Sequence, residues 1–148
     1  MIAFEEVRDR LIGSSMPGAV LQVEPYESAI TDYALLAPDA AADTAHPAWL
    51  VMGSLRSMGI TVEELCALAG MGESDTLLIG TIDIEHRQPL VPGVRYHTRP
   101  VVESVDRRSA RDGSIMDRAV VTVRVLDEGD GVRGVVRSTY LFKRRSEQ

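Results

Sequence analysis

Three ionisable side chains stand close together in a segment of otherwise small residues. Asp39, Asp43 and His46 fall within the stretch PDAAADTAH. Histidine exchanges a proton near neutral pH, and a nearby carboxylate can orient its ring or hold a water molecule. The residue types therefore predict an acid/base site in which His46 is the base and Asp39 or Asp43 assists it. The structural alternative is that His46 caps the following helix and the aspartates accept backbone hydrogen bonds in a loop.

The apolar segment that follows predicts a helix whose first turn would complete such a site. Pro47 to Met58 is apolar almost all round, as in a helix enclosed on several sides. Pro47 suits an early helical position but has no N–H, so Ala48 or Trp49 would have to donate to a developing oxyanion. Trp49 and Met52 are candidates for lining an apolar ligand tunnel. On an enclosed helix, however, these residue types usually pack the core.

Basic side chains form a second group of candidates for ligand binding. Arg95, His97 and Arg99 alternate along a predicted strand and so share one face, where they would suit a phosphate or the acids of a carrier protein. Arg87 precedes that strand at a corner, and loops at sheet ends often border binding sites. The structural explanations are an exposed polar strand face and a surface salt bridge.

The elements that must position these residues change period near the middle of the chain. The first half predicts helices and one short strand, and Thr61 with Glu64 has the form of a capping box. The second half alternates apolar and polar residues, which predicts long strands. We expect helices at 2–12, 28–37, 47–58 and 61–69, and strands at 19–23, 77–84, 94–105, 115–127 and 132–143.

Turn residues organise the predicted strands into one sheet. Gly129, Asp130 and Gly131 supply the tolerance of positive φ that a hairpin between 115–127 and 132–143 needs. Pro89, Pro92 and Gly93 predict a rigid corner between two earlier strands. Helices followed by an uninterrupted run of strands predict an α+β fold in which a long antiparallel sheet wraps one central apolar helix.

Length and composition limit the classes of function. The 148 residues suit a single domain spanning 1–148, and the net charge of −6 disfavours nucleic acid as a partner. Cys66 is the only cysteine and the three histidines are dispersed, so no metal site and no internal disulfide is expected. We also expect no signal peptide and no membrane segment, hence a cytoplasmic protein.

Three segments of the second half resemble a known family. The corner Pro89-Leu90-Val91-Pro92-Gly93, the run from Thr98 to Val105 and the closing Arg137-Ser138-Thr139-Tyr140-Leu141 resemble the MaoC-like acyl dehydratases and hydratases of the hotdog-fold superfamily. The resemblance implies a hotdog fold and edge-to-edge dimers. It also implies acyl groups held as thioesters on coenzyme A or an acyl carrier protein, with no other cofactor. Members add water to a 2-enoyl chain or remove it from a 3-hydroxyacyl chain.

The family's catalytic motif is changed in this chain. Members with hydratase activity have an aspartate, four intervening residues and a histidine, but Asp39 is followed at that spacing by Thr44. His46 instead resembles a histidine that members often carry at the start of the helix.

The leading expectation is therefore an acyl-thioester hydratase or dehydratase, and two alternatives stay open: a hotdog subunit that pairs with a catalytic homologue, and a hotdog thioesterase. The expected partners are an acyl-thioester small molecule and a second hotdog subunit, in a homodimer or a heterodimer.

Overall fold

The fold consists of four helices and five strands in the part of the chain that the structure describes. The structure is a computed structural model, and it describes residues 1–37 and 43–145. The helices are α1 (Phe4–Ile12), α2 (Pro25–Ala34), α3 (Ala48–Arg56) and α4 (Val62–Leu68). The strands are β1 (Val20–Gln22), β2 (Thr76–His86), β3 (Arg95–Ser109), β4 (Ile115–Leu126) and β5 (Val132–Arg144).

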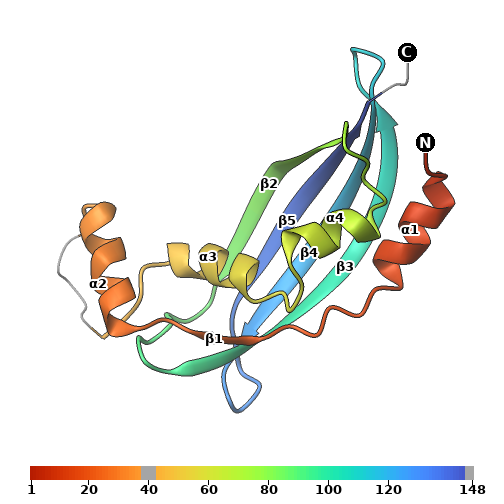
Figure 1. Cartoon of the computed structure of the whole chain (residues 1–148). Helices are drawn as coiled ribbons and strands as arrows, with labels where there is room; N and C mark the ends of the chain where they lie inside the picture. Colours follow the sequence, from red (N-terminus) through yellow and green to blue (C-terminus); the bar gives the residue numbers. More distant parts are fainter. Residues whose placement is uncertain (38–42, 146–148) are drawn as a thin grey trace.

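The strands form one antiparallel sheet in the order β1-β3-β4-β5-β2. The sheet curls, and α3 and α4 lie over the same face of it (Figure 1). Helix α3 contacts β5, β4 and β2, while α1 packs against β3. The predicted α+β architecture, a long sheet curled around one apolar helix, is therefore confirmed.

The proline-rich corner fixes the start of α3 as well as the turn between β2 and β3. Gly93 has a φ of 81° and donates its N–H to the carbonyl of Val23 at 2.7 Å, which ties the corner to the end of β1. The Ala45 N–H donates to the carbonyl of Leu90 at 2.7 Å, and both residues are buried. Because Ala45 directly precedes His46, the corner determines where the candidate site lies.

Two glycines allow α3 to lie close to the strands. A Cβ on Gly53 would stand 2.6 Å from a methyl carbon of Leu21 on β1. A Cβ on Gly134 of β5 would stand 2.8 Å from both terminal methyl carbons of Leu50. Trp49 and Leu50 are 4% and 1% exposed, as expected for an enclosed helix.

Strand β2 contains a bulge that its sequence pattern did not predict. The register with β5 shifts between Ile79 and Ile82, so Leu77, Ile79, Ile82 and Ile84 all fall on the face that carries α3. A regular alternation would have put Ile79 and Ile82 on opposite faces. The bulge therefore concentrates apolar side chains on one face of this edge strand.

One local expectation is corrected, and the β4–β5 turn forms at the residues predicted for it. Helix α2 begins at Pro25 rather than at residue 28, because proline occupies the first turn and Glu24 forms a capping box with Glu27. In the β4–β5 turn the residue with positive φ is Asp130, at 61°, and neither neighbouring glycine adopts it. The Asp127 carboxylate stabilises this turn by accepting the N–H groups of Gly129 and Gly131 at 3.0 and 2.8 Å.

A buried ionic network joins the sheet to α4. Arg144 is the last residue of β5, yet its side chain is only 2% exposed. Its guanidinium donates to Asp117 at 2.9 Å and to the carbonyl oxygens of Ala69 and Gly70 at the end of α4. Arg107 also donates to Asp117, at 2.5 and 2.9 Å. One fully buried carboxylate thus receives two guanidinium groups and holds three strands in register with a helix end.

Candidate functional site at the start of helix α3

His46 lies at the N-terminal end of α3, with its imidazole turned back onto the helix. Its Nδ1 accepts the backbone N–H of Ala48 at 3.0 Å. A ring nitrogen that accepts a hydrogen bond carries no proton, so in the neutral imidazole the proton is on Nε2. This contact is the capping role that the sequence left as the alternative to a base. It makes Nε2–H the group of His46 with which a ligand can interact.

The backbone donors of this first turn are engaged within the chain. Besides the Ala48 N–H, the Trp49 N–H donates to the carbonyl of His46 at 2.9 Å and the Leu50 N–H to the carbonyl of Pro47 at 3.0 Å. A thioester oxygen would have to displace one of these bonds in order to use a backbone donor. The assignment of Ala48 or Trp49 as oxyanion donor stays a prediction.

Of the two aspartates in the predicted acid/base site, only Asp43 is among the residues that the structure describes. Asp39 lies outside the described residues. Asp43 lies in an exposed turn three residues before His46. Its role as a partner of His46 stays a prediction.

Trp49 and Met52 lie on α3 as expected, and Trp49 is in the core. Trp49 packs in the cluster that contains Leu50 and Tyr96, with the partly buried Met52 against it. The Arg56 guanidinium stands over the indole ring at 5.6 Å from its centroid. Among residues 1–37 and 43–145 the indole Nε1 has no hydrogen-bond partner. An unbonded buried N–H is costly, so this atom is available to a carbonyl oxygen that enters the core.

The basic candidates lie on the other face of the sheet. Tyr96 and Thr98 are buried under the helices, so Arg95, His97 and Arg99 share the opposite face, as predicted. The Asp130 carboxylate lies 3.2 Å from His97 Nε2 and 3.0 Å from Arg99 Nη2. A carboxylate therefore occupies the place predicted for a ligand anion.

Arg87 lies beyond the end of β2 and binds Glu85 at 2.7 Å. Arg95, His97 and Arg99 thus lie on the face of the sheet opposite α3.

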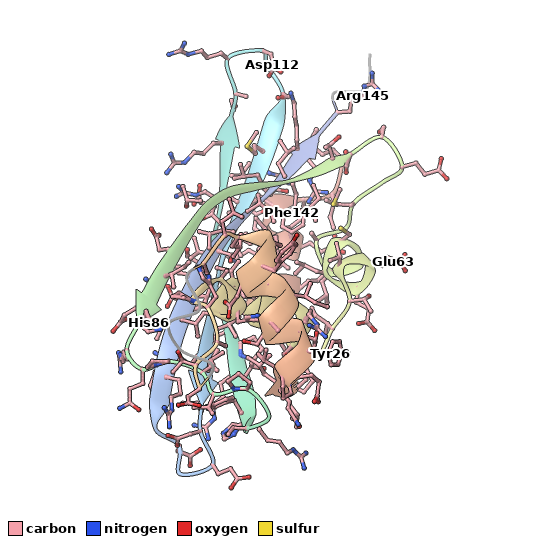
Figure 2. The ribbon with its side chains drawn as sticks, turned by 90° about the vertical axis from the view of Figure 1, so that its left-hand side faces the viewer. Tyr26, Glu63, His86, Asp112, Phe142 and Arg145 are labelled. Atoms are coloured by element: carbon pink, nitrogen blue, oxygen red, sulfur yellow. The ribbon has the colours of Figure 1, made fainter. Side chains whose placement is uncertain are left out.

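Two clefts among the described residues lie at the end of the sheet opposite the corner that holds Ala45, the residue before His46. They have volumes of about 770 and 440 Å³ and are formed around the start of β2 and the end of β5. Asp112 and Arg145, which mark this end, lie far from His86 at the other end of β2 (Figure 2). Neither cleft is lined by a residue that the sequence singled out for chemistry. No group of His, Cys, Asp and Glu residues among those described is arranged to hold a metal ion.

The exposed apolar side chains of β2 were not singled out by the sequence as a functional feature. Leu78, Ile79, Ile82 and Ile84 are 38–49% exposed although they belong to a strand of the sheet. The sequence feature that could have revealed them is the alternation of apolar residues in this strand. That pattern does not distinguish a strand at the centre of a sheet from one at its edge. In the part of the chain that the structure covers, no helix is both long and apolar enough to cross a membrane.

Comparison with known proteins identifies the fold. No protein-family model and no curated protein sequence matches the chain. A hot-dog-like protein from Thermanaerovibrio acidaminovorans is similar with a TM-score of 0.68 and 14% identity, over 95% of this chain and 87% of that one. The ChsH1–ChsH2 complex of Mycobacterium tuberculosis gives a TM-score of 0.66 and 11% identity, over 93% of each chain.

A third similar structure is the C-terminally truncated HadBC complex of Mycobacterium tuberculosis, a 3R-hydroxyacyl-ACP dehydratase. Its TM-score is 0.59 at 11% identity, over 86% of this chain and 98% of that one. Such low identities show a shared fold and nothing finer. The chain has the hotdog fold, which confirms the architecture predicted from its sequence.

Proposed function

We propose that this chain is a MaoC-like hotdog subunit that binds acyl thioesters and takes part in hydration or dehydration together with a second, catalytic hotdog subunit. The acyl group would be a 2-enoyl or 3-hydroxyacyl chain on coenzyme A or an acyl carrier protein. The observation that carries the proposal is the bond from the Ala48 N–H to His46 Nδ1. This bond occupies the lone pair of Nδ1, which the imidazole would need in order to act as a base through that nitrogen. It also engages the Ala48 N–H, one of the two backbone donors predicted for the thioester oxygen.

The chemistry of hydration explains why a second subunit is invoked. A base must activate water, an acid must protonate the α-carbon, and a donor must stabilise the thioester oxygen as it gains charge. With Nδ1 occupied, His46 offers Nε2–H, which suits the donor role. The base would then come from the second subunit.

The similar structures support pairing of two different chains. The ChsH1–ChsH2 and HadBC structures are complexes, and the latter is a hydroxyacyl-ACP dehydratase.

The proposal is tested with the purified chain and crotonyl-CoA. Trp49 is the only tryptophan, so its fluorescence reports on the start of α3. We expect crotonyl-CoA to change this fluorescence while the enoyl absorbance stays constant and no free thiol is released. Hydration by the chain alone, lost in a folded His46→Ala variant, would overturn the proposal in favour of a self-sufficient hydratase. Thiol release without hydration would identify a thioesterase instead.

A stability measurement separates capping by His46 from catalysis. His46→Ala removes the acceptor of the Ala48 N–H, and loss of a helix cap typically costs about 1 kcal/mol of unfolding free energy. His46→Asn keeps a side-chain acceptor and is expected to retain most of that stability. Urea unfolding of the three proteins provides the comparison. Equal stability of the alanine variant and the unmodified chain would contradict the capping role.

A further inference from the structure

Helix α2 presents an apolar stripe that the described chain leaves uncovered. Tyr26, Ile30 and Tyr33 follow one another at helical spacing, and they are 66%, 63% and 85% exposed. We refer to these three residues as the α2 stripe. Residues at i, i+4 and i+7 share one helix face, and in a surface helix such a face normally packs on the core. The apolar face of α2, which would be expected to pack on the protein core, is therefore exposed to solvent in the described chain.

The side of α2 away from the stripe faces α3, where it makes an ion pair and buries Ser28. Glu27 accepts a hydrogen bond from Arg56 of α3 at 3.0 Å and one from the backbone N–H of Glu24 at 3.2 Å. The Arg56 contact and the Glu24 contact lower the pKa of Glu27, which keeps its carboxylate charged. Ser28 is buried. These contacts orient α2 with its stripe away from α3.

Strand β2 borders the same side of the molecule. Figure 1 shows β2 as the outermost strand on the side where α2 stands, and both face the viewer in Figure 2. Within the described chain β2 pairs only with β5, so one row of its backbone N–H and C=O groups has no strand partner. Long apolar edge strands invite pairing with another strand.

We propose that the α2 stripe is a docking surface for the second hotdog subunit, which pairs along the free edge of β2. This inference rests on the proposed function, and it names the surface through which the two subunits recognise each other. The α2 stripe, together with Ile79, Ile82 and Ile84 on the face of β2 that carries α3, offers on the order of 700 Å², close to the roughly 800 Å² that each partner buries in a standard interface. The area is thus sufficient for one stable partner.

The occupant is a different hotdog chain rather than a second copy of this one. A second copy would bring another His46 whose Nδ1 is engaged by Ala48, and so would not supply the missing base. A partner with the hotdog fold would contribute an edge strand that pairs with β2 and an apolar surface that covers the α2 stripe.

The test is affinity purification of the tagged full chain from its native cells, with co-purifying proteins identified from their peptide masses. We expect a second hotdog chain in equimolar amount. The double variant Ile30→Ser with Tyr33→Ser should reduce its recovery roughly ten-fold or more, because exposed aromatic anchors commonly dominate binding. Both side chains are exposed in the chain by itself, so circular dichroism and urea unfolding should be unchanged. The control is Ile12→Ser at the end of α1, which is 50% exposed. Helix α1 contacts β3, which is separated from β2 by two strands of the sheet.

Each other result has a definite meaning. If the double variant retains the hotdog partner while Ile84→Lys on β2 loses it, the docking role of α2 is wrong and pairing along β2 stands. If only the chain itself is recovered, as a stable homodimer, both this inference and the heteromeric part of the proposed function are overturned. Equal loss in the Ile12→Ser control would attribute the effect to general surface polarity and would also refute the inference.

Discussion

Replacing Asp117 with asparagine is expected to lower the free energy of unfolding by about 3–5 kcal/mol, the usual cost of removing one partner from a buried ion pair. The Asp117 side chain is completely buried and accepts hydrogen bonds from Arg107 and Arg144. The variant removes the fully buried carboxylate from the Arg144 guanidinium, which is 2% exposed and then keeps its ion pair with the less deeply buried Asp75. Urea unfolding followed by circular dichroism measures the loss.

The ion pair between Lys143 and Asp112 is the matched control. It joins the same end of β5 to the β3–β4 connection at 2.9 Å, but both side chains are exposed. Exposed pairs are screened by water and contribute little, so Asp112→Asn should change stability far less than Asp117→Asn. Comparable losses in the two variants would contradict the importance of burial for this network.

The same carboxylate predicts the acid dependence of stability. Burial alone raises the pKa of Asp117, but hydrogen bonds from Arg107 and Arg144 outweigh it and hold the pKa below its ordinary value of 3.8. Because the folded pKa is below the unfolded one, this contribution is fully present above the unfolded pKa. It is lost as the pH falls below roughly 4 toward the folded value. Unfolding free energies across this range should therefore fall less steeply for Asp117→Asn than for the unmodified chain.

The second large effect is expected at the contact between α3 and the sheet. Gly134→Ala should destabilise the protein by about 1–3 kcal/mol, as overpacking of a filled core commonly does. The added Cβ would stand 2.8 Å from both methyl carbons of Leu50 and 3.1 Å from the carbonyl oxygen of Glu85. Leu50 is 1% exposed and cannot move aside without disturbing its neighbours. Urea unfolding and the fluorescence of Trp49, one residue away on α3, both monitor the change.

A double-mutant cycle shows whether Leu50 is the cause. In a Leu50→Ala background the space above Gly134 is open, so adding Gly134→Ala should cost clearly less than it does alone. Gly129→Ala serves as the control glycine in the same hairpin, because its nearest contact would be an ordinary 3.5 Å to the Asp127 side chain. If the losses of unfolding free energy in the two single variants add up to the loss in the double variant, contact with Leu50 is not the cause of the destabilisation by Gly134→Ala.

Much of the fold follows from short-range patterns. The capping box at Thr61 forms as predicted, with the Glu64 N–H donating to the threonine hydroxyl at 3.0 Å. The corner through Gly93 and the β4–β5 hairpin also form where turn residues predicted them. Each of these features depends on backbone restrictions within a few residues, so local sequence suffices to specify it.

The candidate site was only partly predictable for the same reason. That His46 would stand at the start of an enclosed helix follows from Pro47 and the apolar run after it. Which of its ring nitrogens would be engaged does not follow from the residue types, and in the structure Nδ1 accepts the Ala48 N–H. The neighbouring Ala45 is held by the carbonyl of Leu90, so a contact between segments more than forty residues apart helps to position His46.

The sequence by itself determined the apolar helix, the order of the strands along the chain and the corner, because periodicity and turn chemistry act within one turn or one strand. The tertiary structure decided that β2 is an edge strand with a bulge, that Arg144 is buried against Asp117, and that His97 faces Asp130 away from α3. Those outcomes depend on which strands become neighbours and on which charges meet after the sheet closes around α3. Contacts between distant segments set them, and no pattern within a single segment records such contacts.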